Sequence, residues 1–283
     1  MNQSESSKNL ECIAIVGIAV RMPGAADVRQ FWENLKTGKE CISLFSKDEM
    51  LEAGVSSEMI DLPNYVAAKG ILEGVELFDA NFFGIAPREA ELMDPQHRVL
   101  MECAWAAMED AGYVPEQYPG RIAVFTSAGM NTYLPVNLMS NPDLLEQVGG
   151  FELSIYNDKD FVPTRIAYSM NIKGPAIDIG TACSSSLVST HLACQHLLTY
   201  QSDMALVGGI TIHLPQKVGH LHEAGSAYSP DRHCRPFDST QSGLIDGNGA
   251  AVIIVKRLED ALNDGDKIHA LIRGSAINND GSD

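Results

Sequence analysis

Short apolar runs, separated by glycine, proline and polar positions, dominate the pattern along the chain. Continuous runs of this length are typical of strands buried on both faces of a sheet, since a strand with one exposed face alternates apolar and polar residues. Residues 1–10 contain no such run and are predicted to form a polar N-terminal tail. Strands are predicted over residues 12–19, 121–127, 175–179, 204–209 and 249–256, and a further unit begins over residues 267–277.

Segments between these strands carry the apolar spacing of helices. A first helix follows Asp27, a residue type favoured at the N-cap, and extends to Leu35. A second begins at Asp94 and Pro95 and ends before Gly112, because proline is favoured in the first turn and glycine after the last. A third follows residue 183, and the absence of charged residues from 179 to 202 predicts that it is buried nearly all round.

Buried strands that alternate with helices indicate an α/β fold with a sheet covered on both faces. Residues 36–90 interrupt this alternation and are predicted to be rich in loops, because glycine and proline break any long element there. The chain has no short-period repeat and no low-complexity linker.

Composition narrows the class of protein. With 283 residues and 45% hydrophobic content, the chain is long enough to bury a large core. No apolar run approaches the roughly 20 residues that span a bilayer, so we expect no membrane insertion. A net charge of −17 without a basic block disfavours a nucleic-acid partner. The first residues lack the apolar core of a signal peptide, and no Cys-x-x-Cys pair occurs, so we expect reduced thiols in the cytoplasm.

Cys183 is the candidate nucleophile, because it lies between a predicted strand and a predicted helix. A thiol in the first turn of a helix faces unpaired backbone N–H groups and the positive end of the helix dipole, which stabilise thiolate over thiol. This arrangement resembles a nucleophile elbow. Free cysteine is also among the most commonly buried residue types, so packing alone remains an equal alternative at this point. Cys194 lies within the same helix without a terminus to activate it and is predicted to be core.

Other candidate sites are less well supported. The ligand types His213, His220, His222, His233 and Cys234 cluster in sequence, but their spacing matches no structural zinc pattern, so no metal site is predicted.

A cysteine hydrolase needs a base near Cys183, and the spacing of His191 and His196 does not show that either one reaches the thiol. Core packing is favoured for both histidines and for Cys194. Asp178 and Asp246 are interpreted as turn or structural residues rather than as an acid–base pair.

Several separated motifs together resemble the condensing domain, or β-ketoacyl synthase, of a modular polyketide or hybrid peptide–polyketide synthase. They cover nearly the whole chain from residue 11 onward. The motifs are residues 15–19 (IVGIA), 21–24 (RMPG), 94–98 (DPQHR), 109–113 (EDAGY), 163–168 (PTRIAY), 173–175 (KGP), 181–186 (TACSSS), 229–238 (SPDRHCRPFD) and 273–281 (RGSAINNDG).

The resemblance implies a thiolase-like fold, in which two similar α/β halves pack together, usually as a homodimer. Cys183 matches the family's acyl-accepting cysteine. The implied reaction moves an acyl chain from the phosphopantetheine of an acyl carrier protein onto Cys183 and then condenses it with a decarboxylating malonyl-type extender to a 3-oxoacyl thioester, as in fatty acid biosynthesis. The implied partners are the acyl carrier protein and adjacent synthase domains, and no cofactor or metal is bound by the domain itself.

The family's two catalytic histidines come from His-Gly-Thr and Asn-x-Gly-His motifs, and neither motif occurs in this sequence. Residues 11–283 are therefore interpreted as the N-terminal region of the synthase domain. We expect this chain alone to load an acyl group without condensing it, to expose apolar surface and to self-associate. A non-elongating, carrier-binding or scaffolding role is the alternative.

Residues 217–220 resemble the second histidine motif, but they lie before the 229–238 motif, so His220 is not expected to be catalytic. Three positions depart from the family pattern. Gly180 stands where Asp or Gln is common, His97 where Gln is usual, and Asp246 where Gly is frequent.

Overall fold

A mixed β-sheet forms the centre of the computed structural model, which describes residues 12–282. The predicted tail over residues 1–10 lies outside the described residues. Six strands in the described part form the sheet in the order β10-β1-β9-β7-β5-β6. They are β1 (Ile13–Arg21), β5 (Ile122–Ala128), β6 (Ala176–Asp178), β7 (Met204–Thr211), β9 (Gly249–Arg257) and β10 (Ala270–Ile272). The predicted strands are therefore confirmed.

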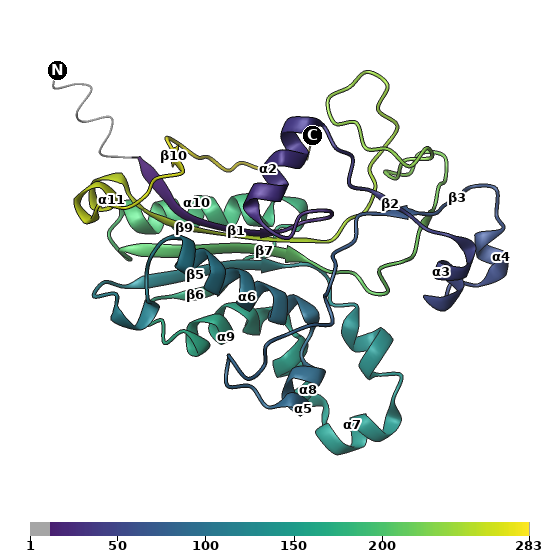
Figure 1. Ribbon diagram of the computed structural model, residues 1–283, viewed down its shortest axis with the longest axis horizontal. Helices are drawn as coiled ribbons and strands as arrows, with labels where there is room; N and C mark the ends of the chain where they lie inside the picture. The colour runs from purple at the N-terminus through teal and green to yellow at the C-terminus, as the bar shows by residue number, and fades with distance from the viewer. Residues whose placement is uncertain (1–11, 283) are drawn as a thin grey trace.

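The sheet contains both parallel and antiparallel strand pairs. β5 runs parallel to its neighbours β6 and β7, whereas β9 pairs antiparallel with both β7 and β1, and β1 pairs antiparallel with β10. The inner strands β1, β5, β7 and β9 are largely apolar and buried, and helices cover both faces of the sheet, as Figure 1 shows. Figure 1 also shows helix α10 on one face and helices α6 and α9 on the other.

The helices begin and end close to the predicted positions. Asp27 caps the first by accepting a hydrogen bond from the backbone N–H of Gln30, and Asp94 caps the long helix α6 in the same way through Gln96. The longer helices are α2 (Val28–Thr37), α6 (Pro95–Asp110), α7 (Pro142–Val148), α8 (Gly150–Asn157), α9 (Val162–Ser169), α10 (Ser185–Leu198) and α11 (Leu258–Asp264). None of the helices within residues 12–282 is both long and apolar enough to cross a membrane.

Short elements and connecting segments lie outside the sheet. They occupy much of the region from 36 to 90, which confirms that it is rich in loops. These elements are β2 (Ser43–Leu44), α3 (Lys47–Glu52), α4 (Ser57–Ile60), β3 (Tyr65–Val66), β4 (Ala68–Lys69), α5 (Pro87–Leu92), η1 (Pro115–Gln117), η2 (Leu134–Leu138), η3 (Lys159–Phe161), η4 (Ala182–Ser184) and β8 (His220–Leu221).

Helix α6 packs closely against β1 through Gly17. A Cβ atom at this glycine would lie 2.3 Å from the carbonyl oxygen of Ala107 and 2.8 Å from the Cβ of Ala111. Real Cβ atoms do not approach backbone oxygens so closely, so glycine is required for the helix to reach the strand. The IVGIA motif thus has a packing role.

Helix α10 differs from its prediction. Among its described side chains only Ser189, Ala193, Cys194 and Leu197 are buried, and the last three pack against residues of the sheet. Leu187 in the first turn is 74% exposed. The prediction of burial nearly all round was wrong for this chain, because an apolar sequence shows that a helix surface can be buried but not that a neighbour covers it.

Candidate functional site

The chain reaches Cys183 through a tight turn between β6 and α10. The backbone of Ala182 has a φ of 52°, in the left-handed region, and a short 3₁₀ turn precedes the helix. Ser184 Oγ donates to the Thr181 carbonyl at 2.8 Å, and Ser185 Oγ donates to the Ala182 carbonyl at 2.7 Å. The serines that follow the thiol therefore fix the turn.

The thiol lies slightly farther from the helix than the sequence suggested. Helix α10 begins at Ser185, so Cys183 belongs to the 3₁₀ turn before it rather than to its first turn. The physical reason is the competition between side chain and backbone: Ser185 Oγ accepts from the backbone N–H of Thr181 at 2.8 Å and stabilises the turn.

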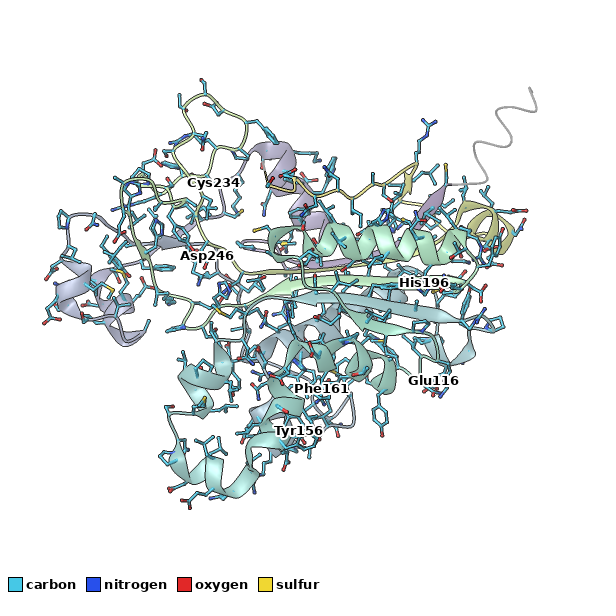
Figure 2. The ribbon with its side chains drawn as sticks, turned by 180° about the vertical axis from the view of Figure 1, so that it is seen from behind. Glu116, Tyr156, Phe161, His196, Cys234 and Asp246 are labelled. Carbon is cyan, nitrogen blue, oxygen red and sulfur yellow. The ribbon has the colours of Figure 1, made fainter. Side chains whose placement is uncertain are left out.

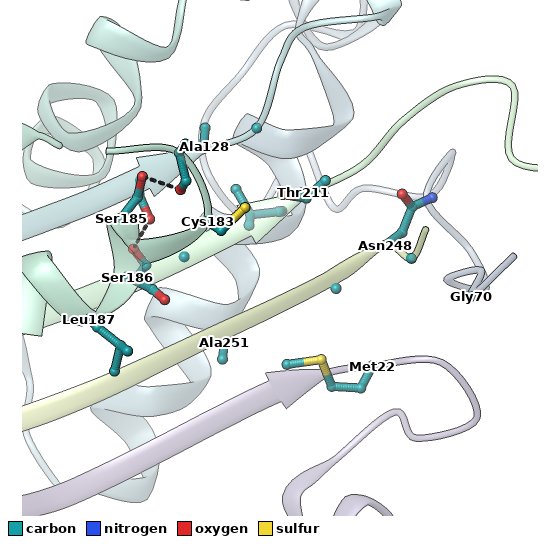
Figure 3. Close-up of a pocket in the computed structure, with 18 of the residues that line it drawn as sticks. Met22, Gly70, Ala128, Cys183, Ser185, Ser186, Leu187, Thr211, Asn248 and Ala251 are labelled. Atoms are coloured by element: carbon teal, nitrogen blue, oxygen red, sulfur yellow. Dashed lines mark hydrogen bonds between the residues drawn. The ribbon is translucent and has the colours of Figure 1, made fainter. Parts of the chain in front are cut away.

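Two cavities in the described part of the chain meet at Cys183. The first, called the apolar cavity, has a volume of about 700 Å³, and its lining includes Met22, Leu187, Ile210, Ala251 and Ile253. Figure 3 shows Cys183 on one side of this cavity, with Met22 and Asn248 on the other. The second, called the polar cavity, has about 940 Å³, and its lining includes Gln96, His97, Asn131, Lys159, Thr211, His213 and Asp246.

The other cysteines have different surroundings. Cys194 is buried in the core, which confirms its prediction, and burial raises the pKa of its thiol to about 11. Burial likewise raises the pKa of the Cys103 thiol to about 12. Cys41 and Cys234 reach the surface but line neither cavity. Among the thiols of residues 12–282, Cys183 alone combines exposure with a place in both cavities.

The start of helix α6 frames the polar cavity. Gln96 Oε1 accepts hydrogen bonds from the backbone N–H groups of Gly129 at 3.0 Å and Ile212 at 3.3 Å, which ties the helix to the ends of β5 and β7. Next to it, His97 is buried. Desolvation, reinforced by the charge of Arg165, lowers the pKa of His97 to about 3, so its imidazole is neutral.

Three polar side chains distant in sequence meet at the wall of the polar cavity. His213 Nδ1 lies 3.1 Å from Asp246 Oδ2, and Lys69 Nζ lies 3.2 Å from the same oxygen. The hydrogen bond with His213, followed by the Lys69 charge, lowers the pKa of Asp246 to about 2. Figure 2 shows that Asp246 lies at the opposite end of the sheet from His196. We call Lys69, His213 and Asp246 the cavity triad.

Sequence reasoning did not identify the cavity triad. Asp246 was interpreted as a turn or structural residue, and His213 was considered only as a metal ligand. The one available signal was Asp246 itself, since it departs from the family pattern. No sequence pattern relates positions 69, 213 and 246, because only the fold brings the end of β7, the loop before β9 and the end of β4 together.

The histidines considered as bases or metal ligands mostly lie elsewhere. His191 Nδ1 is 2.9 Å from Ser275 Oγ, and the His196 ring packs edge-on against Phe125. His220 stacks on Tyr228 and its Nε2 donates to the Ser229 carbonyl at 2.9 Å. None of these three lines a cavity with Cys183, so neither base considered for a cysteine hydrolase is in place.

Metal-ligating side chains do not gather within the described residues. No group of three or more histidine, cysteine, aspartate or glutamate side chains over residues 12–282 could hold a metal ion. His222 binds the Tyr228 carbonyl, while His233 contacts the Glu40 carboxylate at 2.8 Å. The sequence cluster of histidines is thus divided among separate local contacts.

Asp178 lies at the end of β6, just before the turn that carries Cys183. Its carboxylate is half-buried, and Oδ1 has no hydrogen-bond partner among the described residues. Desolvation raises the pKa of Asp178 to about 6 against the opposing charge of Lys159. It lines neither cavity, so a structural interpretation still fits.

Comparisons with known proteins agree with this geometry. The sequence profile of the β-ketoacyl synthase N-terminal domain matches residues 10–261. A phenolphthiocerol/phthiocerol polyketide synthase from Mycobacterium tuberculosis is 48% identical over 276 residues, covering 95% of this chain and 18% of that protein. Polyketide synthase PksN of Bacillus subtilis is 40% identical over 273 residues, covering 96% of this chain and 5% of that protein.

Solved structures show the same relation. Ketosynthase twelve of the bacillaene polyketide synthase from Bacillus amyloliquefaciens has a TM-score of 0.89 at 38% identity, covering 97% of this chain and 48% of that chain. The module 1 ketosynthase of the bacillaene synthase from Bacillus amyloliquefaciens FZB42 gives 0.81 at 38% identity, covering 98% and 47%. The chain thus spans about half of these structures and less than a fifth of the curated relatives. The predicted thiolase-like fold is confirmed.

Proposed function

Since the chain belongs to the β-ketoacyl synthase family, we propose that Cys183 accepts an acyl chain by thioester exchange with an acyl carrier protein. The observation that carries this proposal is the position of Cys183, an exposed thiol on a fixed turn where the apolar and polar cavities meet. A nucleophile of this kind needs open access for one partner and enclosed room for the acyl group.

The exchange breaks one thioester for each thioester that it forms. The Cys183 thiolate attacks the carbonyl carbon of the carrier-bound acyl group, a sulfur–carbon bond to Cys183 forms, and the bond to the phosphopantetheine sulfur breaks. The carrier thiolate leaves and takes up the proton that Cys183 released. The chain's contribution is to hold the sulfur at the rim of both cavities, because the hydrogen bonds of Ser184 and Ser185 fix the turn.

We further propose the setting in which this step occurs. The acyl carrier protein supplies substrate on phosphopantetheine, adjacent synthase domains and a second copy of the domain are partners, and the compartment is the cytoplasm. Support comes from family membership and from exposed apolar side chains that a partner surface would cover, such as Met130, Phe151 and Tyr168.

Decarboxylative condensation with a malonyl-type extender is the proposed second half of the reaction in the synthase. For the 283-residue chain we expect loading without a 3-oxoacyl product, because its sequence contains neither histidine motif. The non-elongating scaffold is not favoured, since the relatives named above are polyketide synthases and ketosynthases.

Acyl transfer to the intact chain tests the loading step. We expect incubation with an acyl-carrier thioester to add one acyl mass to the chain and to its Cys194→Ala variant. The Cys183→Ala variant should gain none. An equal mass gain in Cys183→Ala would overturn the proposal, and circular dichroism of the variants checks that each one is folded.

A further inference from the structure

The cavity triad places hydrogen-bonding groups in the same cavity as the nucleophile. Lys69 is 4% exposed, and its ammonium holds the Asp246 carboxylate from the protein side. His213 and Asp246 are only partly buried, and both line the polar cavity together with Cys183. The buried charge therefore fixes a pair that lines the same cavity as the thiol.

The hydrogen-bonding roles within this pair follow from its geometry. Asp246 is ionised at neutral pH, so its Oδ2 can only accept a hydrogen bond. The His213 nitrogen 3.1 Å away, Nδ1, must then carry the ring proton. In the neutral ring this leaves Nε2 with a free lone pair, as an acceptor.

When the His213 ring is neutral, both open atoms of the pair are acceptors. The contacts of the pair with each other and with Lys69 are made through His213 Nδ1 and Asp246 Oδ2, which leaves His213 Nε2 and Asp246 Oδ1 for a ligand. Two acceptors that line a pocket favour a ligand that brings a donor, because an acceptor on the ligand would face like dipoles.

Gln96 and His97, which also line the polar cavity, offer a ligand little hydrogen bonding. The Gln96 amide is satisfied by Gly129, Ile212 and Asp94. His97 is neutral and buried, and its ring nitrogens make no hydrogen bond of normal geometry to any described residue. Lys159 also lines the cavity and would instead favour an acceptor on the ligand, which makes the keto group the natural competitor in a test.

We propose that His213 is a specificity-determining residue, whose Nε2 accepts a hydrogen bond from a hydroxyl group on the acyl chain delivered to Cys183. Asp246 is its positioning residue. The inference rests on the proposed function and names its substrate class, acyl thioesters that carry a hydroxyl. Such a hydroxyl arises by reduction of a 3-oxoacyl thioester, so a carbonyl-reducing reaction must supply the substrate.

Binding of unreactive analogues tests the inference without acyl transfer. Hexanoyl, 3-hydroxyhexanoyl, 5-hydroxyhexanoyl and 3-oxohexanoyl pantetheine amides are titrated calorimetrically into the 283-residue chain. We expect one of the hydroxylated amides to bind about 5- to 10-fold more tightly than the hexanoyl amide, as one hydrogen bond gives. That ratio should fall below about 2 in His213→Leu and recover partly in His213→Gln, which returns an acceptor.

Two further variants separate specificity from general damage. His220→Leu removes an imidazole outside both cavities and should keep the preference. Asp246→Asn should reduce the preference for the hydroxylated amide while leaving hexanoyl binding within about 2-fold, whereas a merely structural role would weaken both amides alike.

Equal binding of the hydroxylated and hexanoyl amides by the unmodified chain would overturn the inference, as would tightest binding of the 3-oxo amide. A loss of affinity for all four amides in His213→Leu would mean that the histidine binds the pantetheine amides, which also contradicts it. The proposed function fails separately, when no acyl-carrier thioester acylates Cys183 even though the binding preference is present.

Discussion

Helices α6 and α10 pack on opposite faces of one sheet, yet they are buried to very different extents. Within the described residues, eleven of the sixteen residues of α6 are buried, against four of the fourteen of α10. The first turns of both helices nevertheless lie beside the same cavity. Gln96 and His97 of α6 line the polar cavity together with Cys183 and Ser185. The buried helix holds the strand ends in position, and the exposed one follows directly after the turn that carries the thiol. The helix that stabilises the sheet and the helix next to the thiol thus lie on opposite faces of the sheet.

Matched leucine-to-alanine substitutions test this difference most strongly. Leu100 of α6 is fully buried, whereas Leu187 of α10 is 74% exposed. We expect Leu100→Ala to lower the free energy of unfolding by about 3 kcal/mol, because it removes buried methyl groups and leaves a cavity. Leu187→Ala should change it by less than about 0.5 kcal/mol. Urea unfolding followed by circular dichroism measures both free energies. Similar losses of stability in the two variants would contradict the difference between the helices.

The close approach of α6 to β1 gives an intermediate effect. Gly17→Ala places a Cβ 2.3 Å from the Ala107 carbonyl oxygen, so the helix must move away from the strand. We expect a loss of about 2 kcal/mol in the same urea assay. Gly274→Ala is the matched control, since a Cβ there meets nothing within 4 Å. A Gly17→Ala chain as stable as the control would show that the helix can shift freely.

The smallest expected effect is on the urea midpoint when Asp178, at the end of β6 just before the turn of Cys183, is replaced. Burial raises the pKa of Asp178 to about 6, so the folded chain binds its proton more tightly than the unfolded chain does. This contribution to stability is complete below about pH 4 and is lost as pH rises towards 6 and beyond. Asp178→Asn should therefore raise the urea midpoint at pH 7 slightly more than at pH 4.

The urea midpoints of the unmodified chain and of the Asp178→Asn variant, measured at pH 4 and pH 7, test this prediction. Asp203 provides a contrast, because hydrogen bonds from Arg121 and Arg257 lower the pKa of its carboxylate. Asp203→Asn should therefore destabilise the chain at pH 7 rather than stabilise it. A pH-independent effect of Asp178→Asn would contradict the assigned protonation.

The comparison of the two helices also shows what the sequence could predict. The limits of α6 follow from local chemistry, since Asp94 caps the helix and its apolar residues match the helical repeat. The strand, turn and helix around Cys183 were likewise predictable, because they are contiguous in sequence. These features depend on neighbours in sequence, and the structure confirms the elements they predict.

Features that depend on distant neighbours were not predictable. The exposed side of α10, including Leu187, has the same composition as its buried side, so only the packing distinguishes them. The cavity triad depends on three strand or loop ends that meet through the sheet order. A pairwise contact between His213 and Asp246 has no local signature, which is why the polar wall of the cavity was missed.

The most direct test of the account is the position of the acyl group among the six cysteines of the unmodified chain. After transfer from an acyl-carrier thioester, the chain is digested at acidic pH and the acylated peptide is identified by tandem mass spectrometry. We predict a single thioester on Cys183, because it is the exposed thiol at the meeting of the two cavities. Acylation of Cys41 or Cys234 at a similar level would contradict the account, since it would show that exposure alone determines the site.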